Sequence, residues 1–293
     1  MFVYCYIKRR RCFHLTLACS ERGERMRSII GGVILVVVLA VAILALRGSV
    51  AHVQPLHDHF KSYLVSGYIL PAPIDVVLRD QFGEMQGIVE HLTMFSPPAE
   101  KRLPTGETSP IIHPENHLTW YDFIGPVGEP ERTLLVSNQF GDDQEWVVKN
   151  PVLLLLPAWK PYVNGQPTYL APPSGLDHYL CYEVISGLPV GLDGVILTDQ
   201  FDQEPVTVGD PILLCNPADK IVPDDGIPIF DNENHLACYD ITPYLSPALT
   251  EVVANDQFGD SQFTVLDHQF LCVPSTKEIK PSGCMASTAE GVE

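Results

Sequence analysis

The stretch that decides the fold is residues 178–220, which read H-Y-L-C-Y-E-V at 178–184, V-I-L-T-D-Q-F at 195–201 and I-L-L-C-N-P-A-D-K at 212–220. The same pattern occurs four times in the chain. In every copy a histidine lies 21 positions before the D-Q-F position; the pairs are His59 and Asp80, His117 and Asn138, His178 and Asp199, and His235 and Asp256. Each copy ends in P-x-x-K, with Lys101, Lys160, Lys220 and Lys277. Equal spacing in four places identifies a repeat protein.

The copies alternate in their first residues. The first and third begin Asp-His-aromatic at 58–60 and 177–179, whereas the second and fourth begin Asn-His-Leu at 116–118 and 234–236. One copy of about 58 residues would be marginally stable alone, and a pair has the size of an ordinary domain. We therefore expect two domains, residues 52–165 and 170–278, each an internal duplication.

Short apolar runs rich in β-branched and aromatic residues recur in each copy, bounded by Pro, Gly, Asn and Asp. Examples are 179–184, 195–201, 206–208 and 212–215. Their lengths and their lack of helical periodicity predict strands. Seven or eight strands per pair suit a β-sandwich or a small barrel. The predicted fold class is therefore all-β, with two tandem sandwich or barrel-like domains joined by a proline-rich linker at 161–175.

The first 51 residues differ from the rest. They hold eight of the 18 Lys and Arg residues, then an apolar run at 29–46 and the small residues Ser49, Val50 and Ala51. This order predicts a secretory signal cleaved after Ala51, with Met26 as an alternative start. The apolar run is also nearly long enough for an uncleaved anchor helix. Either reading places the remaining chain outside the cytoplasm, as a secreted, periplasmic or cell-surface protein. The polar tail 279–293 is expected to be disordered.

Beyond residue 51 the chain is strongly acidic, with 10 Lys and Arg (18 minus 8) against 34 Asp and Glu (36 minus Glu21 and Glu24). Nucleic-acid binding needs a basic face, so this composition argues against it. The acidity serves either solubility or cation binding. Calcium prefers six to eight oxygen ligands, and the candidate ligands are Asp199, Asp202, Asp256 and Asp260. The alternative is that these residues form solvated acidic loops.

Cysteines occur in two matched pairs. Cys181 and Cys215 are 34 positions apart, as are Cys238 and Cys272. The corresponding positions hold Ser62 and Ser96 in the first copy, and Trp120 and Leu155 in the second. In each copy the two cysteines are either both present or both absent. This predicts disulfides within copies, as an oxidising compartment permits. Pairing between copies, such as Cys215 with Cys238, is the rival, and Cys284 is left over.

The recurring His, Asp and Lys residues suggest a catalytic group, but Asn138 stands at the aspartate position of the second copy. Asn and Asp share the ability to accept a backbone hydrogen bond in a turn, which favours a structural role. We expect the histidine to bond to backbone at a strand start, and the lysine to bind a loop carbonyl or an acid.

The tryptophans either stack on sugars or fill the core. No G-x-S-x-G, H-E-x-x-H or P-loop sequence is present, which favours a non-enzymatic protein.

The patterns H-x-x-C-Y at 235–239, D-Q-F-G at 256–259 and C-x-P-x-x-K at 272–277 carry a resemblance to a known family. Over residues 56–277 the chain resembles an uncharacterised domain of unknown function that occurs in tandem in secreted bacterial and archaeal proteins. The resemblance implies export but no activity or site. The leading prediction is an exported structural or binding module of the cell surface or extracellular matrix. The alternatives are a calcium-dependent glycan- or protein-binding adhesin and a hydrolase with an unrecognised site.

Overall fold

A computed structural model describes residues 57–220 and 228–280, and every regular element in these ranges is a β-strand. The all-β prediction is confirmed. No helix in the described ranges is long and apolar enough to cross a bilayer. The predicted N-terminal helix, the cleavage position at Ala51, and the tail from residue 281 with Cys284 lie outside the described residues.

Each copy contributes a first strand, a hairpin strand and a long strand. The first strands are β1 (His59–Ser66), β6 (His117–Ile124), β10 (His178–Ser186) and β13 (His235–Thr242). The hairpin strands are β2 (Ile74–Asp80), β7 (Arg132–Asn138), β11 (Leu192–Thr198) and β14 (Thr250–Asp256). The long strands are β3 (Gly83–Ser96) continued by β4 (Pro98–Arg102), then β8 (Gly141–Val163), β12 (Gln203–Lys220) and β15 (Gly259–Ile279). Two short strands, β5 (Thr108–Ser109) and β9 (Gln166–Pro167), pair with β4 and β8.

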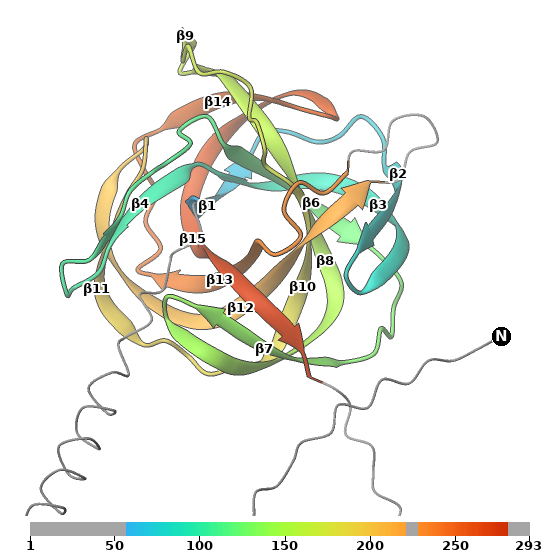
Figure 1. Cartoon of the computed structure of the whole chain (residues 1–293). Helices are drawn as coiled ribbons and strands as arrows, with labels where there is room; N and C mark the ends of the chain where they lie inside the picture. The colour runs from blue at the N-terminus through green and yellow to red at the C-terminus, as the bar shows by residue number, and fades with distance from the viewer. Residues whose placement is uncertain (1–56, 221–227, 281–293) are drawn as a thin grey trace, which may run out of the picture. The chain divides into compact units, whose positions relative to one another are not determined.

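The first and long strands close into a ring (Figure 1). Each first strand lies antiparallel between the long strand of its own copy and that of the preceding copy, as β6 does between β3 and β8. β10 lies in the same way between β8 and β12, and β13 between β12 and β15. β1 pairs with β3 and also with β15, which joins the first copy to the last. The ring therefore has eight strands, and the four first strands all run in one direction.

The hairpin strands pair with copies on the opposite side of the ring. β2 pairs with the end of β12, and β11 pairs with β4, so the first and third copies exchange hairpins. β7 pairs with the end of β15, and β14 with the end of β8, so the second and fourth copies do the same. Figure 1 places these four hairpin strands on four different sides of the ring. Every copy is thus paired with all three others.

This pairing corrects the expected division into two domains. The proposed boundary at 165–170 is crossed by the pairing of β8 with β10, for example at Leu155 and Tyr179. The described residues, 57–220 and 228–280, belong to one compact unit. Half of the ring would expose unpaired strand edges, which a closed sheet removes. The architecture is barrel-like, and it contains one ring where two sandwiches or barrels were expected.

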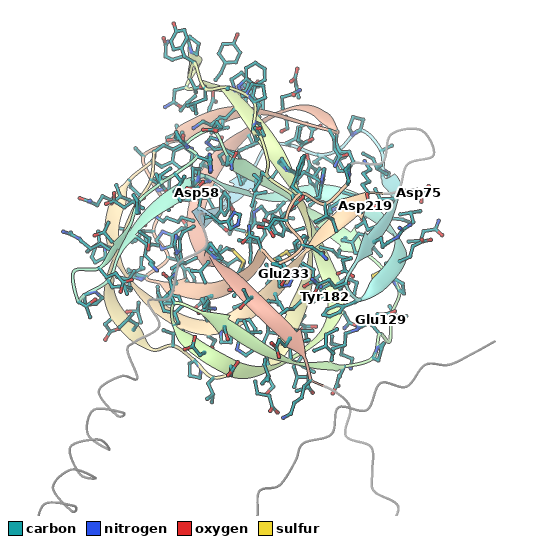
Figure 2. The ribbon with its side chains drawn as sticks, viewed as in Figure 1. Asp58, Asp75, Glu129, Tyr182, Asp219 and Glu233 are labelled. Atoms are coloured by element: carbon teal, nitrogen blue, oxygen red, sulfur yellow. A yellow bond between two sulfur atoms is a disulfide. The ribbon has the colours of Figure 1, made fainter. Side chains whose placement is uncertain are left out.

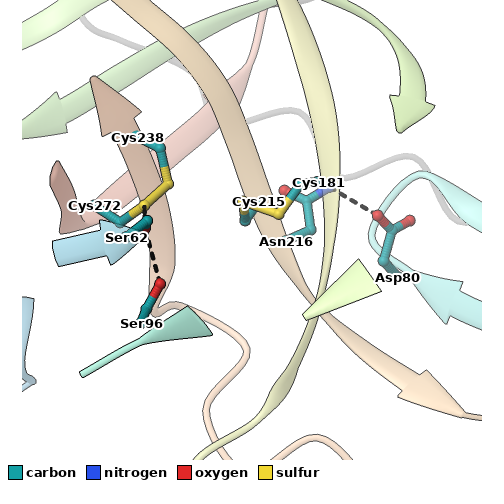
Figure 3. The surroundings of a disulfide bond; sticks show 8 residues. All are labelled: Ser62, Asp80, Ser96, Cys181, Cys215, Asn216, Cys238 and Cys272. Carbon is teal, nitrogen blue, oxygen red and sulfur yellow. Dashed lines mark hydrogen bonds between the residues drawn. A yellow bond between two sulfur atoms is a disulfide. The ribbon is translucent and has the colours of Figure 1, made fainter. Parts of the chain in front are cut away.

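Side chains alternate between the two faces of a strand, and the ring therefore separates two cores. The inner core contains Phe60, Leu118, Tyr179 and Leu236 from the four first strands, and both disulfides (Figure 3). The outer core packs the other face of the ring against the hairpins, and includes Tyr63, Tyr121, Tyr182 and Tyr239. Trp120 and Trp146 are fully buried in these cores, so these two tryptophans fill the interior and are not available to stack on sugars.

Candidate functional site

The repeated His, Lys and D-Q-F residues meet where consecutive copies join. We call these four places the joints. The joint residues are His59, Lys101 and 138–140 (joint 1/2), His117, Lys160 and 199–201 (joint 2/3), His178, Lys220 and 256–258 (joint 3/4), and His235, Lys277 and 80–82 (joint 4/1). In each joint the lysine of one copy lies over the phenylalanine ring of the next, with Nζ 5.2, 5.7, 4.7 and 4.6 Å from the ring centre. Such cation–π contacts are stabilising when desolvated.

A tyrosine from the opposite side of the ring completes each joint. The Tyr63 hydroxyl donates to Asp199 Oδ2 at 2.7 Å, and the Tyr121 hydroxyl donates to Asp256 Oδ2 at 2.8 Å. In joint 1/2 the direction is reversed, because Asn138 Nδ2 donates to the Tyr239 hydroxyl at 2.9 Å. The fourth tyrosine is Tyr182, which Figure 2 labels. Its ring lies edge-on to that of Phe82, with the two ring centres 4.9 Å apart. Three copies therefore contribute to each joint.

The D-Q-F segment is a turn, as predicted. The side-chain Oδ1 accepts a hydrogen bond from the backbone N–H of the phenylalanine two residues later, at 2.7 Å from Asp80, 2.9 Å from Asn138, 2.6 Å from Asp199 and 2.7 Å from Asp256. Asn138 makes the same bond as the aspartates, so no charge is needed for it. The following Gly83 and Gly259 have φ of 129° and 111°, which favours glycine.

The four histidines are buried and neutral. Burial lowers the pKa of His59, His117 and His235 to about 3, and that of His178 to about 4. His117 Nδ1 lies 2.9 Å from the Glu115 carbonyl oxygen, which is the backbone bond expected at a strand start. His59 contacts the Gln139 side chain of the next copy instead, at 2.9 Å. His59 and His117 therefore contact the next copy, through Gln139 and Gln200 respectively.

The lysines have a role that the sequence left open. Burial lowers the pKa of Lys101 to about 7 and that of Lys160 and Lys277 to about 8. Desolvation disfavours the ammonium form, and packing on the phenylalanine ring partly offsets that cost. The joint residues thus form buried contacts between copies. Their hydrogen bonds and cation–π contacts hold the ring together.

The four predicted calcium ligands lie in or just after the D-Q-F segments of two different joints. Asp202 Oδ1 is 2.6 Å from Lys61 Nζ, and Asp260 Oδ1 accepts from Asn255 Nδ2 at 2.8 Å. Asp256 Oδ2 accepts from the Thr119 hydroxyl at 2.6 Å. Across residues 57–220 and 228–280, no three His, Cys, Asp or Glu side chains are arranged to hold a metal ion. The structure does not bring the four carboxylates together.

The alternating Asp and Asn before each histidine has a local cause that sequence reasoning missed. Asp58 accepts hydrogen bonds from the backbone N–H of Ile112 (2.6 Å) and His113 (3.0 Å), in the loop that precedes the second copy. Asp177 accepts in the same way from Phe230 (2.7 Å) and Asp231 (2.9 Å), in the loop that precedes the fourth copy. The aspartate occurs in the first and third copies because there it binds the backbone of the loop that leads into the next copy. The alternation of Asp and Asn therefore does not indicate a domain boundary.

A second missed group is a buried charged cluster of Lys61, Asp202, Glu204 and His268. The corresponding residues in the other first strands at the Lys61 position are Thr119, Leu180 and Ala237. A lysine at a position that is otherwise apolar or small was the signal that could have indicated it.

Beside joint 2/3 lies a hollow of about 330 Å³, lined mainly by Pro97, Pro98, Ile111, Pro114 and Leu170. Its polar lining residues include His117 and Asp199, which already bond within the protein. The hollow therefore adds no free acid or base to the joint.

Four loops leave the ring at a single end, because the four first strands run in one direction. They are residues 67–73, 125–131, 187–191 and 243–249, and we call this the loop end. Each loop carries an exposed aliphatic side chain: Ile69 (74% exposed), Val127 (97%), Leu188 (76%) and Leu249 (82%). Asp122, Glu183 and Asp240 occupy equivalent positions on the first strands near this end. The loop end is therefore both apolar and acidic.

Comparison with known proteins gives one match. No curated protein and no solved structure matches the chain significantly. Residues 117–274 match a family described as a repeat of unknown function (DUF7450), and they are more than half of the chain. The match begins at the first histidine of the second copy and extends through the fourth. The chain belongs to this family, the repeat of unknown function DUF7450.

Proposed function

We propose that this protein is an exported, non-enzymatic module of the cell surface or extracellular matrix that binds a protein partner at its loop end. The observation that carries the proposal is the exposed aliphatic residue in each of the four loops. All four side chains lie at one end of the ring, and exposed apolar surface is a feature of interaction sites. Loops positioned by a rigid scaffold commonly hold binding residues.

The construction of the ring supports a scaffold role. Its recurring polar residues are buried in the joints, where they bond to one another and hold the copies together. The bridges Cys181–Cys215 and Cys238–Cys272 form within copies, as predicted. Disulfides are compatible with a location outside the cytoplasm.

The chemistry of the loop end indicates the kind of partner. Its four most exposed apolar side chains are aliphatic and suit an apolar protein surface, and the ring of Tyr244, which is 49% exposed, adds to this apolar area. Glu183 is exposed, Asp122 and Asp240 are partly exposed, and Asp122 Oδ2 lies 3.5 Å from the exposed His91 ring. A partner that combines apolar and basic side chains would be complementary to this surface.

The test is binding of the purified chain, labelled, to the intact cells and shed matrix of a producing culture. Replacing Ile69, Val127, Leu188 and Leu249 together by Ser should abolish binding, because the apolar contacts are lost. The matched control replaces Ile112, Phe230 and Ile279 by Ser, which are exposed elsewhere, and it should bind like the wild type. Equal binding by the loop variant and the wild type would refute the proposal.

A further inference from the structure

The buried charged cluster centres on Lys61 of β1. Its side chain is completely buried, and its Nζ lies 2.6 Å from Asp202 Oδ1. The same Nζ also contacts Glu204 Oε1. Asp202 and Glu204 belong to the third copy, whereas Lys61 belongs to the first. The contacts therefore cross between copies that lie on opposite sides of the ring.

Glu204 also lies next to a buried histidine. Nδ1 of His268, on β15, lies 2.8 Å from Glu204 Oε1, and its Nε2 lies 2.6 Å from the Pro243 carbonyl oxygen. Nε2 must carry a hydrogen to donate to that carbonyl, and burial lowers the pKa of His268. Among the described residues, Nδ1 makes no hydrogen bond. Glu204 therefore lies between Lys61 Nζ and a histidine nitrogen, where it can transfer protons to and from Lys61.

Burial makes the charged state of this cluster costly. Each ion removed from water loses several kcal/mol of hydration free energy, and only part of this is recovered by pairing. Converting the ammonium and a carboxylate into a neutral amide removes both charges. Groups held in contact by a folded protein react with effective concentrations on the order of 10⁵–10⁸ M. Folding therefore favours condensation here in a way that open solution does not.

We propose that the Lys61 amine and the Asp202 carboxyl group condense into an amide bond once the ring has folded, with Glu204 transferring the protons. The Lys61 ammonium gives one proton to Glu204, and the resulting amine attacks Asp202 Cγ; a bond forms between Nζ and Cγ, and one Cγ–O bond breaks. Glu204 passes this proton, and a second one that the nitrogen loses after the attack, to the departing oxygen, which leaves as water. One ammonium and one carboxylate become one amide and one water, and no oxidant or cofactor is needed.

One neighbour and its own exposure make Asp202 suitable as the acceptor of the new bond. The Tyr63 hydroxyl lies 3.2 Å from Asp202 Oδ1, where it can donate to the oxygen that gains charge during attack. The Asp202 side chain is 22% exposed, against 9% for Glu204 and 0% for Lys61. Water released at Asp202 therefore has a path out of the cluster.

The crosslink would brace the half of the chain that has no disulfide. Both bridges close within the third and fourth copies. Ser62, next to Lys61, stands where those copies have cysteine. An amide from Lys61 to Asp202 would tie the first copy to the third.

Mass spectrometry of the purified full chain, unfolded and reduced, tests the proposal. The wild type should be lighter than its sequence by one water, its peptide containing Lys61 should be joined to that containing Asp202, and trypsin should fail to cut after Lys61. Lys61→Arg, Asp202→Ala and Glu204→Gln should show full mass. Asp202→Asn should lose one ammonia in place of water.

The control is Lys101→Arg, which changes another buried lysine and should still lose one water. Melting curves show which variants fold. The mass of the wild type shows whether the amide forms, and this result does not depend on the folding of any variant. A wild type at full mass, or a link that ends at Glu204, would overturn the proposal. Loss of water in folded Glu204→Gln would remove the role assigned to Glu204.

Discussion

Lys101 is the joint lysine with the weakest electrostatic support. The other three joints contain an aspartate, whereas joint 1/2 contains Asn138. Among the described residues, Lys101 Nζ has no hydrogen-bond partner. Its pKa falls to about 7, below the value of about 8 for Lys160 and Lys277. A charged lysine at this place therefore destabilises the folded state.

Replacing Lys101 by Met should stabilise the protein below pH 7. The pKa of this lysine is lower in the folded protein than its ordinary 10.5. As pH falls from 10.5 toward 7, the unfolded chain therefore takes up a proton that the folded chain does not. The destabilisation grows through this window and is complete below it. Denaturant unfolding should show a gain of a few kcal/mol below pH 7 that vanishes near pH 10.5.

The control for this change is Lys149→Met, which removes a partly exposed lysine 3.5 Å from Glu131. It should alter stability little at either pH. A benefit of Lys101→Met that is the same at both pH values would contradict the assignment of the pKa shift to Lys101.

At the scale of strands, the first copy has two serines at the positions where the third and fourth copies have a disulfide. Ser62 and Ser96 lie across β1 and β3, and their hydroxyl oxygens are 2.8 Å apart (Figure 3). Changing both residues to Cys should form a third disulfide across 34 positions. The stabilisation should be about 2–4 kcal/mol, because the unfolded chain is restricted. Thiol titration and denaturant unfolding, with and without reductant, would measure it.

The reduced double variant is the proper reference for this change. A single cysteine at either position is unsuitable, because Ser62 Oγ lies 3.9 Å from Cys272 Sγ and a thiol there could attack the existing bridge. Two more free thiols than in the wild type, measured on the folded oxidised protein, would show that the first copy is not equivalent to the third and fourth at this place.

The sequence predicts strand-level features well when their partners are close along the chain. The 34-residue spacing of the cysteines predicts the two bridges because the first and long strands of one copy are neighbours. The D-Q-F turn is local and is also correct. The exchange of β2 with β12 and of β7 with β15 has no local signal, because it pairs segments more than a hundred residues apart. For the same reason, Lys61 and Glu204 could not be associated from sequence.

For the whole molecule, the closed ring predicts a single unfolding transition. Calorimetry of the chain should give equal calorimetric and van't Hoff enthalpies, the mark of all-or-none unfolding. Residues 54–165 and 166–293 expressed separately should each fail to fold, since each lacks the partners of its long strands and hairpins. Two resolved transitions, or a half that folds alone, would restore the two-domain interpretation.

That interpretation failed for a physical reason. Asp58 and Asp177 made the copies appear to alternate in pairs, but each caps the loop that leads into the next copy. Two consecutive copies are therefore linked by this hydrogen bonding between an aspartate and a loop, but they do not form a separate domain.

The pairing of β1 with β15 also ties assembly to synthesis. The partner of β1 is β15, the long strand of the fourth copy, so a growing chain cannot complete the ring until the fourth copy has emerged. Until then β1 has a free edge that can pair with another chain. If the chain crosses a membrane from its N-terminus, β1 has an unpaired edge until the fourth copy has crossed as well. The number of copies is equally constrained, because hairpins are exchanged two copies apart and a fifth copy would have no partner.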